Sequence, residues 1–358
     1  MAMTPRERVL TALDHKVPDR IPLDFWAVPE VWDKLYEHFN THDDNQILDN
    51  LHCDIRAFSP DYIGPPLRKL PDGTFYDRIG CHRRIVDNGF CKYDEYASYP
   101  LADIEDVSEL DDYEWWPNPD HYDYEGLSKK IGDAHDKYYI KLETGGIYEF
   151  AWALRGMEQF MIDMLTEPEI ASGIMQHITD FYCEFIRRCM DAAGDKFDLI
   201  YTYDDIACQN GLLFSKELWR DLVRPCHVQL NKVAHSYGKK VMYHSCGAVY
   251  PLIGELAQLP IEILNPLQPL AAGMDFEKIK KEFGKTLCFH GGIDIQHLLP
   301  HGTVEEVRSA VRSAIDRLGP DGYILTAAHH IQGDTPLENI LAMYDEAANY
   351  SLQGKNQA

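Results

Sequence analysis

Hydrophobic and polar positions alternate along the chain in a way that predicts repeated strand and helix units. Short apolar or β-branched runs near residues 21, 54, 139, 200, 241, 262, 287 and 323 predict eight strands. Stretches of helical periodicity follow most of these runs, for example 148–165, 168–193, 216–237 and 304–318, and Thr4 and Thr303 are expected to cap the helices that they precede. Eight such units predict an α/β fold, a distorted (β/α)₈ TIM barrel, with residues 1–358 as a single domain. A doubly wound open sheet is the alternative, but no Gly-x-Gly-x-x-Gly motif follows the first strand.

The segment 60–124 departs from this alternation. Turn signals at 71–74 and 87–90 separate aromatic and β-branched residues, which predicts an antiparallel hairpin or small meander within 67–99. An acidic stretch follows, up to residue 124. Long excursions from compact domains are commonly lids or binding loops, so we expect 60–124 to be a lid or a partner-binding insert.

Composition narrows the class of protein. The chain has 358 residues and a formal net charge of −24, which argues against nucleic acid as a partner. No apolar run approaches the length of a membrane span, and the N-terminus resembles an amphipathic helix rather than a signal peptide. The nine cysteines show no paired spacing, so a reduced, cytoplasmic protein is the simplest interpretation.

Polar side chains gather where the predicted strands end. In a TIM barrel the carboxyl ends of the strands surround the active site, and buried polar groups there cost stability unless they are satisfied. This pattern favours an enzyme. We expect Asp204, Asp205 and Glu149 to be catalytic. The candidates for substrate binding are Asp24, Tyr148, Gln209, Asn265, Gly291, Gly292 and Asp294.

The fifth predicted strand ends in a candidate metal site. His244 and Cys246 are two residues apart, so on an extended backbone they share a face, and an imidazole beside a thiol suits Zn²⁺. His329, just past the eighth strand, is the expected third ligand, while His330 is expected to point elsewhere. Cys208 is a weaker candidate. The fourth position is left to Glu149, to one of the two aspartates, or to water or substrate. A buried cysteine and a hydrogen-bonded histidine at a strand end remain the alternative.

Several motifs together resemble the uroporphyrinogen decarboxylase superfamily over nearly the whole chain. They are Thr4 to Val9 with Pro18 to Pro22, Asp204-Asp205 to Pro225, His244 to Gly247, Gly291 to Asp294, and Gly322 to Leu325. The resemblance implies a distorted (β/α)₈ barrel, in agreement with the strand count, and a homodimer is plausible on the same ground.

Two activities occur in this superfamily. True uroporphyrinogen decarboxylases have an arginine-rich motif after the first strand to hold the substrate carboxylates, and residues 23–30 contain no arginine. The other branch comprises zinc-dependent methyltransferases that act with corrinoid proteins or methylcobamides, whose signature is His-x-Cys after strand five and a cysteine after strand eight. His244 and Cys246 match the first part, whereas His329 stands where the second cysteine is expected.

The resemblance therefore implies a zinc-dependent methyltransferase that moves a methyl group between a corrinoid and a small thiol or other donor or acceptor. In this interpretation Zn²⁺ is the cofactor, and the corrinoid is a co-substrate, free or on a partner protein. Two alternatives stay open. One is a metal-free decarboxylase in which Asp205 or Asp24 stabilises a protonated intermediate. The other is a non-catalytic protein that binds a corrinoid or tetrapyrrole.

Overall fold

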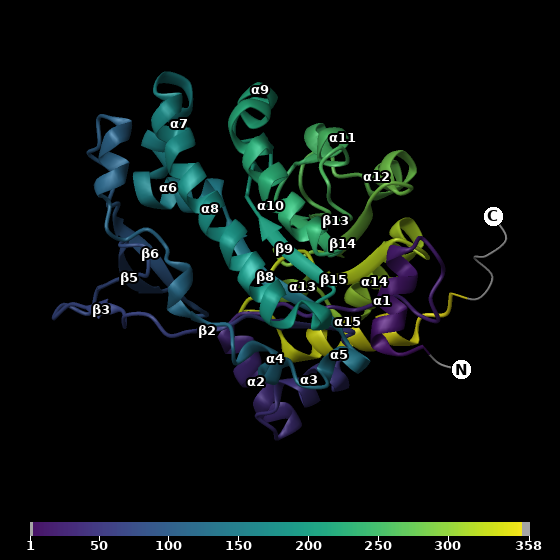
Figure 1. Cartoon of the computed structure of the whole chain (residues 1–358). Coiled ribbons are helices and arrows are strands. Elements are labelled where there is room, and N and C mark those ends of the chain that lie inside the picture. The colour runs from purple at the N-terminus through teal and green to yellow at the C-terminus, as the bar shows by residue number, and fades with distance from the viewer. Residues whose placement is uncertain (1–2, 353–358) are drawn as a thin grey trace.

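Seven parallel strands form a curled sheet in which each strand lies beside its neighbours in chain order, as the computed structural model shows for residues 3–352 (Figure 1). The pairings run in parallel throughout. This curled sheet with surrounding helices confirms the predicted TIM-barrel class. The strands are β1 (Ile55–Phe58), β8 (Tyr139–Gly146), β9 (Leu199–Tyr203), β12 (Lys240–His244), β13 (Ile263–Leu267), β14 (Cys288–Ile293) and β15 (Tyr323–Ala327).

The first predicted strand is an extended segment that makes only isolated bridges. Leu23 bridges Leu325 of β15, and its carbonyl accepts a hydrogen bond from Asp54 just before β1, so the segment fills the gap between the two ends of the sheet. It makes no regular ladder because Pro22 has no N–H and the Leu23 amide donates to the Asp54 carboxylate at 2.9 Å. The eighth position of the barrel is therefore occupied by a strand-like segment rather than a strand.

Helices cover the outside of the sheet and close one end of the barrel. Val9 and Leu13 of α1 pack against the first residues of several strands, including Tyr139 and Leu199, and so seal the amino-terminal end of the barrel. The helices are α1 (Pro5–Leu13), α2 (Pro29–Phe39), α3 (Asp44–Asn50), α4 (Leu127–Ile131), α5 (Ala134–Lys137), α6 (Tyr148–Arg155), α7 (Met157–Thr166), α8 (Pro168–Ala193), α9 (Lys216–Leu218), α10 (Arg224–Ser236), α11 (Ile253–Leu256), α12 (Phe276–Phe283), α13 (Leu298–His301), α14 (Val304–Leu318) and α15 (Leu337–Asn349).

Two predicted helices are interrupted. The helix expected over 148–165 breaks at Gly156, whose φ of +89° favours glycine, and this separates α6 from α7. The helix expected over 216–237 contains a π-helical turn, Trp219–Val223, directly before α10. Pro225 follows that turn and lacks the N–H needed to continue a regular ladder. Within residues 3–352, no helix combines the length and apolar composition that crossing a membrane requires.

The segment between β1 and β8 forms a separate small sheet, which confirms the predicted antiparallel insert. The short strands β2 (Asp61–Tyr62) and β7 (Tyr122–Asp123) pair antiparallel, so the insert leaves and re-enters the barrel at one place. In Figure 1 the meander lies at the left, away from α12 and α14 on the right. Its four strands pair consecutively, as β3 (Arg68–Lys69), β4 (Phe75–Tyr76), β5 (His82–Asp87) and β6 (Lys92–Ser98).

Candidate functional site

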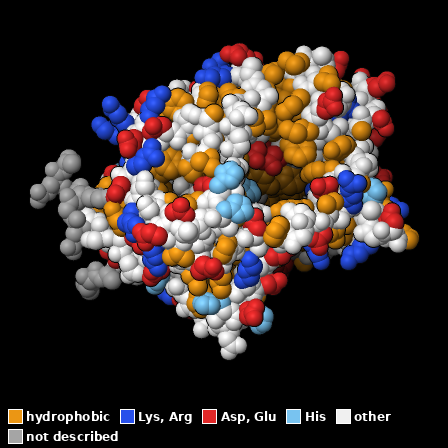
Figure 2. Space-filling model, turned by 180° about the vertical axis from the view of Figure 1, so that it is seen from behind, with side chains coloured by type: hydrophobic (Ala, Val, Ile, Leu, Met, Phe, Trp, Pro, Cys, Tyr) orange, Lys and Arg blue, Asp and Glu red, His pale blue; other side chains and the backbone are white. Residues whose placement is uncertain are grey.

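A cavity of about 690 Å³ lies at the carboxyl ends of the barrel strands. Aromatic side chains and ionisable groups share its wall. Figure 2 shows a hollowed face with hydrophobic, acidic and histidine side chains around the hollow, the same kinds of side chain that line this cavity. The wall comprises Asp24 to Ala27, Trp32, Asp44, Asn45, Leu48, Ile55 to Phe58, Lys141, Glu143, Thr144, Glu149, Tyr201, Tyr203, Asp205, His244, His329 and His330.

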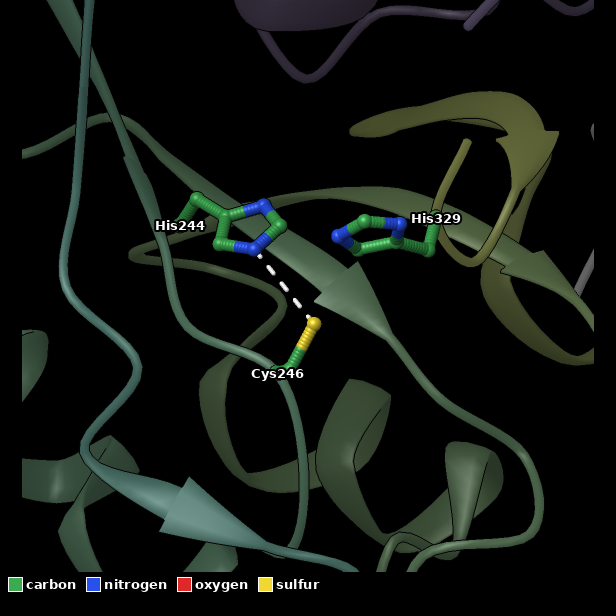
Figure 3. A group of neighbouring side chains, drawn as sticks. All are labelled: His244, Cys246 and His329. Carbon is green, nitrogen blue, oxygen red and sulfur yellow. Dashed lines mark hydrogen bonds between the residues drawn. The ribbon is translucent and has the colours of Figure 1, made fainter. Parts of the chain in front are cut away.

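Three side chains at one side of this cavity converge on a single point. His244, Cys246 and His329 each offer a ligand atom, and these atoms lie within 4.8 Å of one another. Figure 3 shows the two imidazoles and the thiol turned toward one another, with Cys246 Sγ 3.4 Å from His244 Nε2. In a tetrahedral zinc site the corresponding sulfur–nitrogen distance is about 3.6 Å, from ordinary Zn–S and Zn–N bond lengths. The donor set and its spacing therefore fit Zn²⁺.

Carboxylates surround this group and give it a negative environment. Asp205 Oδ1 lies 3.5 Å from His244 Nε2 and accepts the backbone amide of Cys246 at 2.7 Å. Burial, followed by the carboxylates of Asp205 and Glu149, raises the pKa of the Cys246 thiol. Burial together with the charges of Asp205 and Asp204 also raises the pKa of Glu149 to about 8. A bound cation would compensate these clustered acids.

His329 and His330 are neutral at pH 7 in this setting. Burial and the nearby His244 and His330 lower the pKa of His329 to about 4. Burial also lowers the pKa of His330, which lines the same cavity although we expected it to point elsewhere. The chain bends at residues 328–329 instead of continuing the strand, so consecutive side chains do not alternate between opposite faces. Neutral imidazoles are the form that binds metal.

The adjacent aspartates predicted to be catalytic have different surroundings. Asp205 lines the cavity beside His244, whereas Asp204 is fully buried behind it. Asp204 accepts hydrogen bonds from His227 Nε2 at 2.6 Å and from the Glu149 amide at 2.9 Å, which ties β9 to α10 and α6. Asp204 thus secures the wall of the site without facing the cavity, while Asp205 and Glu149 do face it.

Most of the predicted substrate-binding residues lie outside the cavity wall. Tyr148 is fully buried against Phe160 and Phe214, and Asp294 accepts backbone amides at the start of α13. Asn265 is buried between two histidines, and only Asp24 of the predicted set lines the cavity. The others are Gln209, which donates to Gln268, and Gly291 and Gly292, whose positive φ angles and close neighbours leave no room for a side chain.

Several residues of the site were not identified from the sequence. Trp26 lies at the floor, with its indole 5.6 Å from the His330 ring and the Lys141 ammonium 4.4 Å above it. Lys141 is almost fully buried, 3.7 Å from Asp24 and 3.3 Å from Glu143. A signal for Lys141 was available, since it alternates with Ile140 and Leu142 in a strand and so faces the barrel interior.

Comparisons with known proteins agree with this fold. A methylated-thiol–coenzyme M methyltransferase of Methanosarcina mazei is 25% identical over 200 residues, which is 54% of this chain and 49% of the relative. The chain thus spans about half the length of that relative. A solved structure of a methyltransferase from Methanosarcina mazei superimposes with a TM-score of 0.69 at 17% identity, over 97% of this chain and 98% of that one, and shows the fold.

A family profile gives the broader assignment. The profile described as Uroporphyrinogen decarboxylase (URO-D) matches residues 77–350. This match covers β5 to α15, including every residue of the histidine and cysteine group, and it confirms the family predicted from the motifs. The chain belongs to the uroporphyrinogen decarboxylase family.

Proposed function

We propose that this protein is a zinc-dependent methyltransferase that moves a methyl group between a corrinoid and a small thiol or another methyl donor or acceptor. The observation that carries the proposal is the convergence of His244, Cys246 and His329, of which the two histidines line the cavity. Bound there, Zn²⁺ would lower the pKa of a substrate thiol and so supply a thiolate at neutral pH. Three protein ligands leave a fourth position for substrate, as in catalytic zinc sites.

The surrounding residues have separate roles in this proposal. Glu149 lines the cavity, and the charge of a bound Zn²⁺ would lower its pKa from about 8, so that its carboxylate could accept the proton that a substrate thiol releases. Asp205 holds the Cys246 backbone amide and lies beside His244, so it fixes the strand end that carries two ligands. The aromatic wall of Trp26, Tyr201 and Tyr203 excludes water from the reacting atoms.

The insert contacts the loop that follows the third candidate metal ligand. The backbone amide of Gly333, in the loop after β15, donates to Cys91 Sγ at 3.2 Å, and Tyr93 donates a hydrogen bond to Gln332 in the same loop. That loop follows His329 directly. We assign segment 60–124 the role of a lid over the site, with docking of a corrinoid-bearing partner as the alternative.

The pairing of the cationic side chains that line the cavity favours methyl transfer over decarboxylation of a polycarboxylate. Arg56 donates to Asp49 at 2.6 Å and to the carbonyls of Cys53 and Ile55, so its guanidinium is already used by the protein. Lys141 lies between Asp24 and Glu143. Both cationic side chains of the lining are therefore paired with protein acids, and a substrate with many carboxylates would find little free positive charge.

Metal content and methyl transfer test the proposal together. We expect about one zinc per chain in the wild type and its loss in His244→Ala, Cys246→Ala and His329→Ala, because each change removes one of three protein ligands. Cys208→Ala is the matched control, since Cys208 is exposed and outside the converging group. Methyl transfer from methylcobalamin to a thiol is expected to fall with the zinc. Absence of zinc after reconstitution, or transfer that is independent of zinc loading, would refute the proposal.

A further inference from the structure

A continuous line of buried hydrogen bonds leads from the metal group to the segment that closes the barrel. His244 Nδ1 contacts Asn265 Oδ1, and Asn265 Nδ2 contacts His290 Nδ1. His290 Nε2 lies 3.1 Å from Asp24 Oδ2. All four side chains are buried, with Asn265 and His290 completely inaccessible. The line joins β12, β13 and β14, which are neighbours in the sheet, to the extended segment 21–27, which lies on the other side of β15.

The direction of these hydrogen bonds is set at the Asp24 end. Burial alone would raise the pKa of Asp24, but the charge of Lys141 and the hydrogen bond from His290 outweigh it and hold the carboxyl ionised. Trp26 Nε1 also donates to the same oxygen at 2.8 Å. A carboxylate only accepts, so His290 must carry its proton on Nε2. Burial lowers the pKa of His290, so the ring is neutral and Nδ1 is an acceptor.

The orientation of the Asn265 amide then determines which ring nitrogen of His244 carries the proton. Its NH₂ end must face the acceptor nitrogen of His290, which turns its carbonyl end toward His244. The carbonyl accepts, so His244 carries its proton on Nδ1. The lone pair of His244 is then on Nε2, the nitrogen that lies 3.4 Å from Cys246 Sγ in the converging group.

We propose that Asn265, His290 and Asp24 are positioning residues that fix the tautomer of His244 so that Nε2 is free to bind the metal. The inference rests on the metal site of the proposed function and deepens it, since none of the three residues belongs to the group of ligand atoms. Outer partners of metal-bound histidines fix ring orientation, and their loss typically weakens metal binding by about 10- to 100-fold. Asn265 is thereby given a role other than contact with substrate.

Substitutions at Asn265 separate this role from simple packing. We expect Asn265→Ala to weaken zinc binding, measured by competition with a chelator, by about 10- to 100-fold. Asn265→Asp keeps an acceptor for His244 and is expected to bind zinc within a few-fold of the wild type. Asn231→Ala is the matched control, because Asn231 is also completely buried but its side chain makes no hydrogen bond among the described residues. It is expected to leave the zinc affinity unchanged.

A second measurement needs no metal and no activity. The ¹⁵N shifts of the ring nitrogens of His244, assigned with His244→Gln in metal-free protein, report which nitrogen carries the proton. We expect the lone pair on Nε2 in the wild type and in Asn265→Asp, and a mixture of tautomers in Asn265→Ala.

The inference is overturned by a wild-type His244 with its lone pair on Nδ1, or by a folded Asn265→Ala variant that binds zinc as tightly as the wild type. A wild type that binds no zinc would instead refute the proposed function, while the ring shifts would still decide the tautomer.

Discussion

Replacement of Glu149 by glutamine is expected to change how the stability of the metal-free protein depends on pH. The Glu149 carboxyl lies in the cavity wall beside Asp205, whose backbone amide donates to it at 2.8 Å. Burial and the charges of Asp205 and Asp204 raise its pKa from 4.5 to about 8. The folded state therefore holds a proton that the unfolded chain has released over the pH range between these two values.

The sign and size of the effect follow from this shift. The contribution of Glu149 to stability is fully present below pH 4.5, decreases as the pH rises, and is lost above pH 8. A shift of about 3.5 pKa units corresponds to at most about 5 kcal/mol in the free energy of unfolding. Glutamine does not titrate, so the variant is expected to lose less stability than the wild type on going from acidic to alkaline pH.

Urea unfolding of the metal-free wild type and of Glu149→Gln at about pH 5 and pH 9 measures the difference. Glu143→Gln controls for the change in net charge, since Glu143 lines the same cavity but its side chain is 49% exposed. Equal losses of stability in the wild type and in Glu149→Gln over this range would refute the reasoning that the buried carboxyl is protonated in the folded protein at neutral pH.

Three further changes test other parts of the structure. Asp54→Ala removes a buried carboxylate held by Arg8 at 2.5 Å and Arg20 at 2.8 Å, and is expected to lower the free energy of unfolding in urea by about 3–5 kcal/mol. Gly145→Ala places a Cβ 1.7 Å from the Tyr182 hydroxyl and is expected to cost at least about 1–3 kcal/mol by thermal unfolding, while Gly211→Ala, with open space around it, does not clash. Tyr93→Phe removes the hydrogen bond to the loop after β15 and is expected to speed amide exchange in β5 and β6, whereas unchanged exchange would argue against a fastened lid.

Local patterns were sufficient for the units of the fold and for part of the site. Apolar periodicity located seven of the eight barrel positions as strands, because a strand buried between helices and the barrel interior needs a short continuous apolar run. The expected Thr4 and Thr303 caps are present with their acidic partners, since capping depends on residues three apart. His244 and Cys246 share a face for the same local reason.

Contacts between distant parts of the chain decided the rest. Pro22 and the Asp54 carboxylate turn the first expected strand into a bridged segment, and only the fold brings Asp54 to that place. The two adjacent aspartates, 204 and 205, have similar sequence surroundings. Tertiary packing alone decided that Asp204 is hydrogen-bonded to His227 and that Asp205 faces the cavity. A one-dimensional pattern reports which face of an element is buried but not what it meets there.

The sequence by itself determined the order of strands and helices, the antiparallel insert and the pairing of a histidine with a cysteine at one strand end. The tertiary structure decided that His329 reaches the same point from β15, that Lys141 lies over Trp26, and that Asp24 contacts His290 across 266 residues of chain. The physical reason is that side-chain chemistry in a barrel is set where strand ends from the whole chain converge. Their distances depend on sheet closure, and closure is a property of all the strands together.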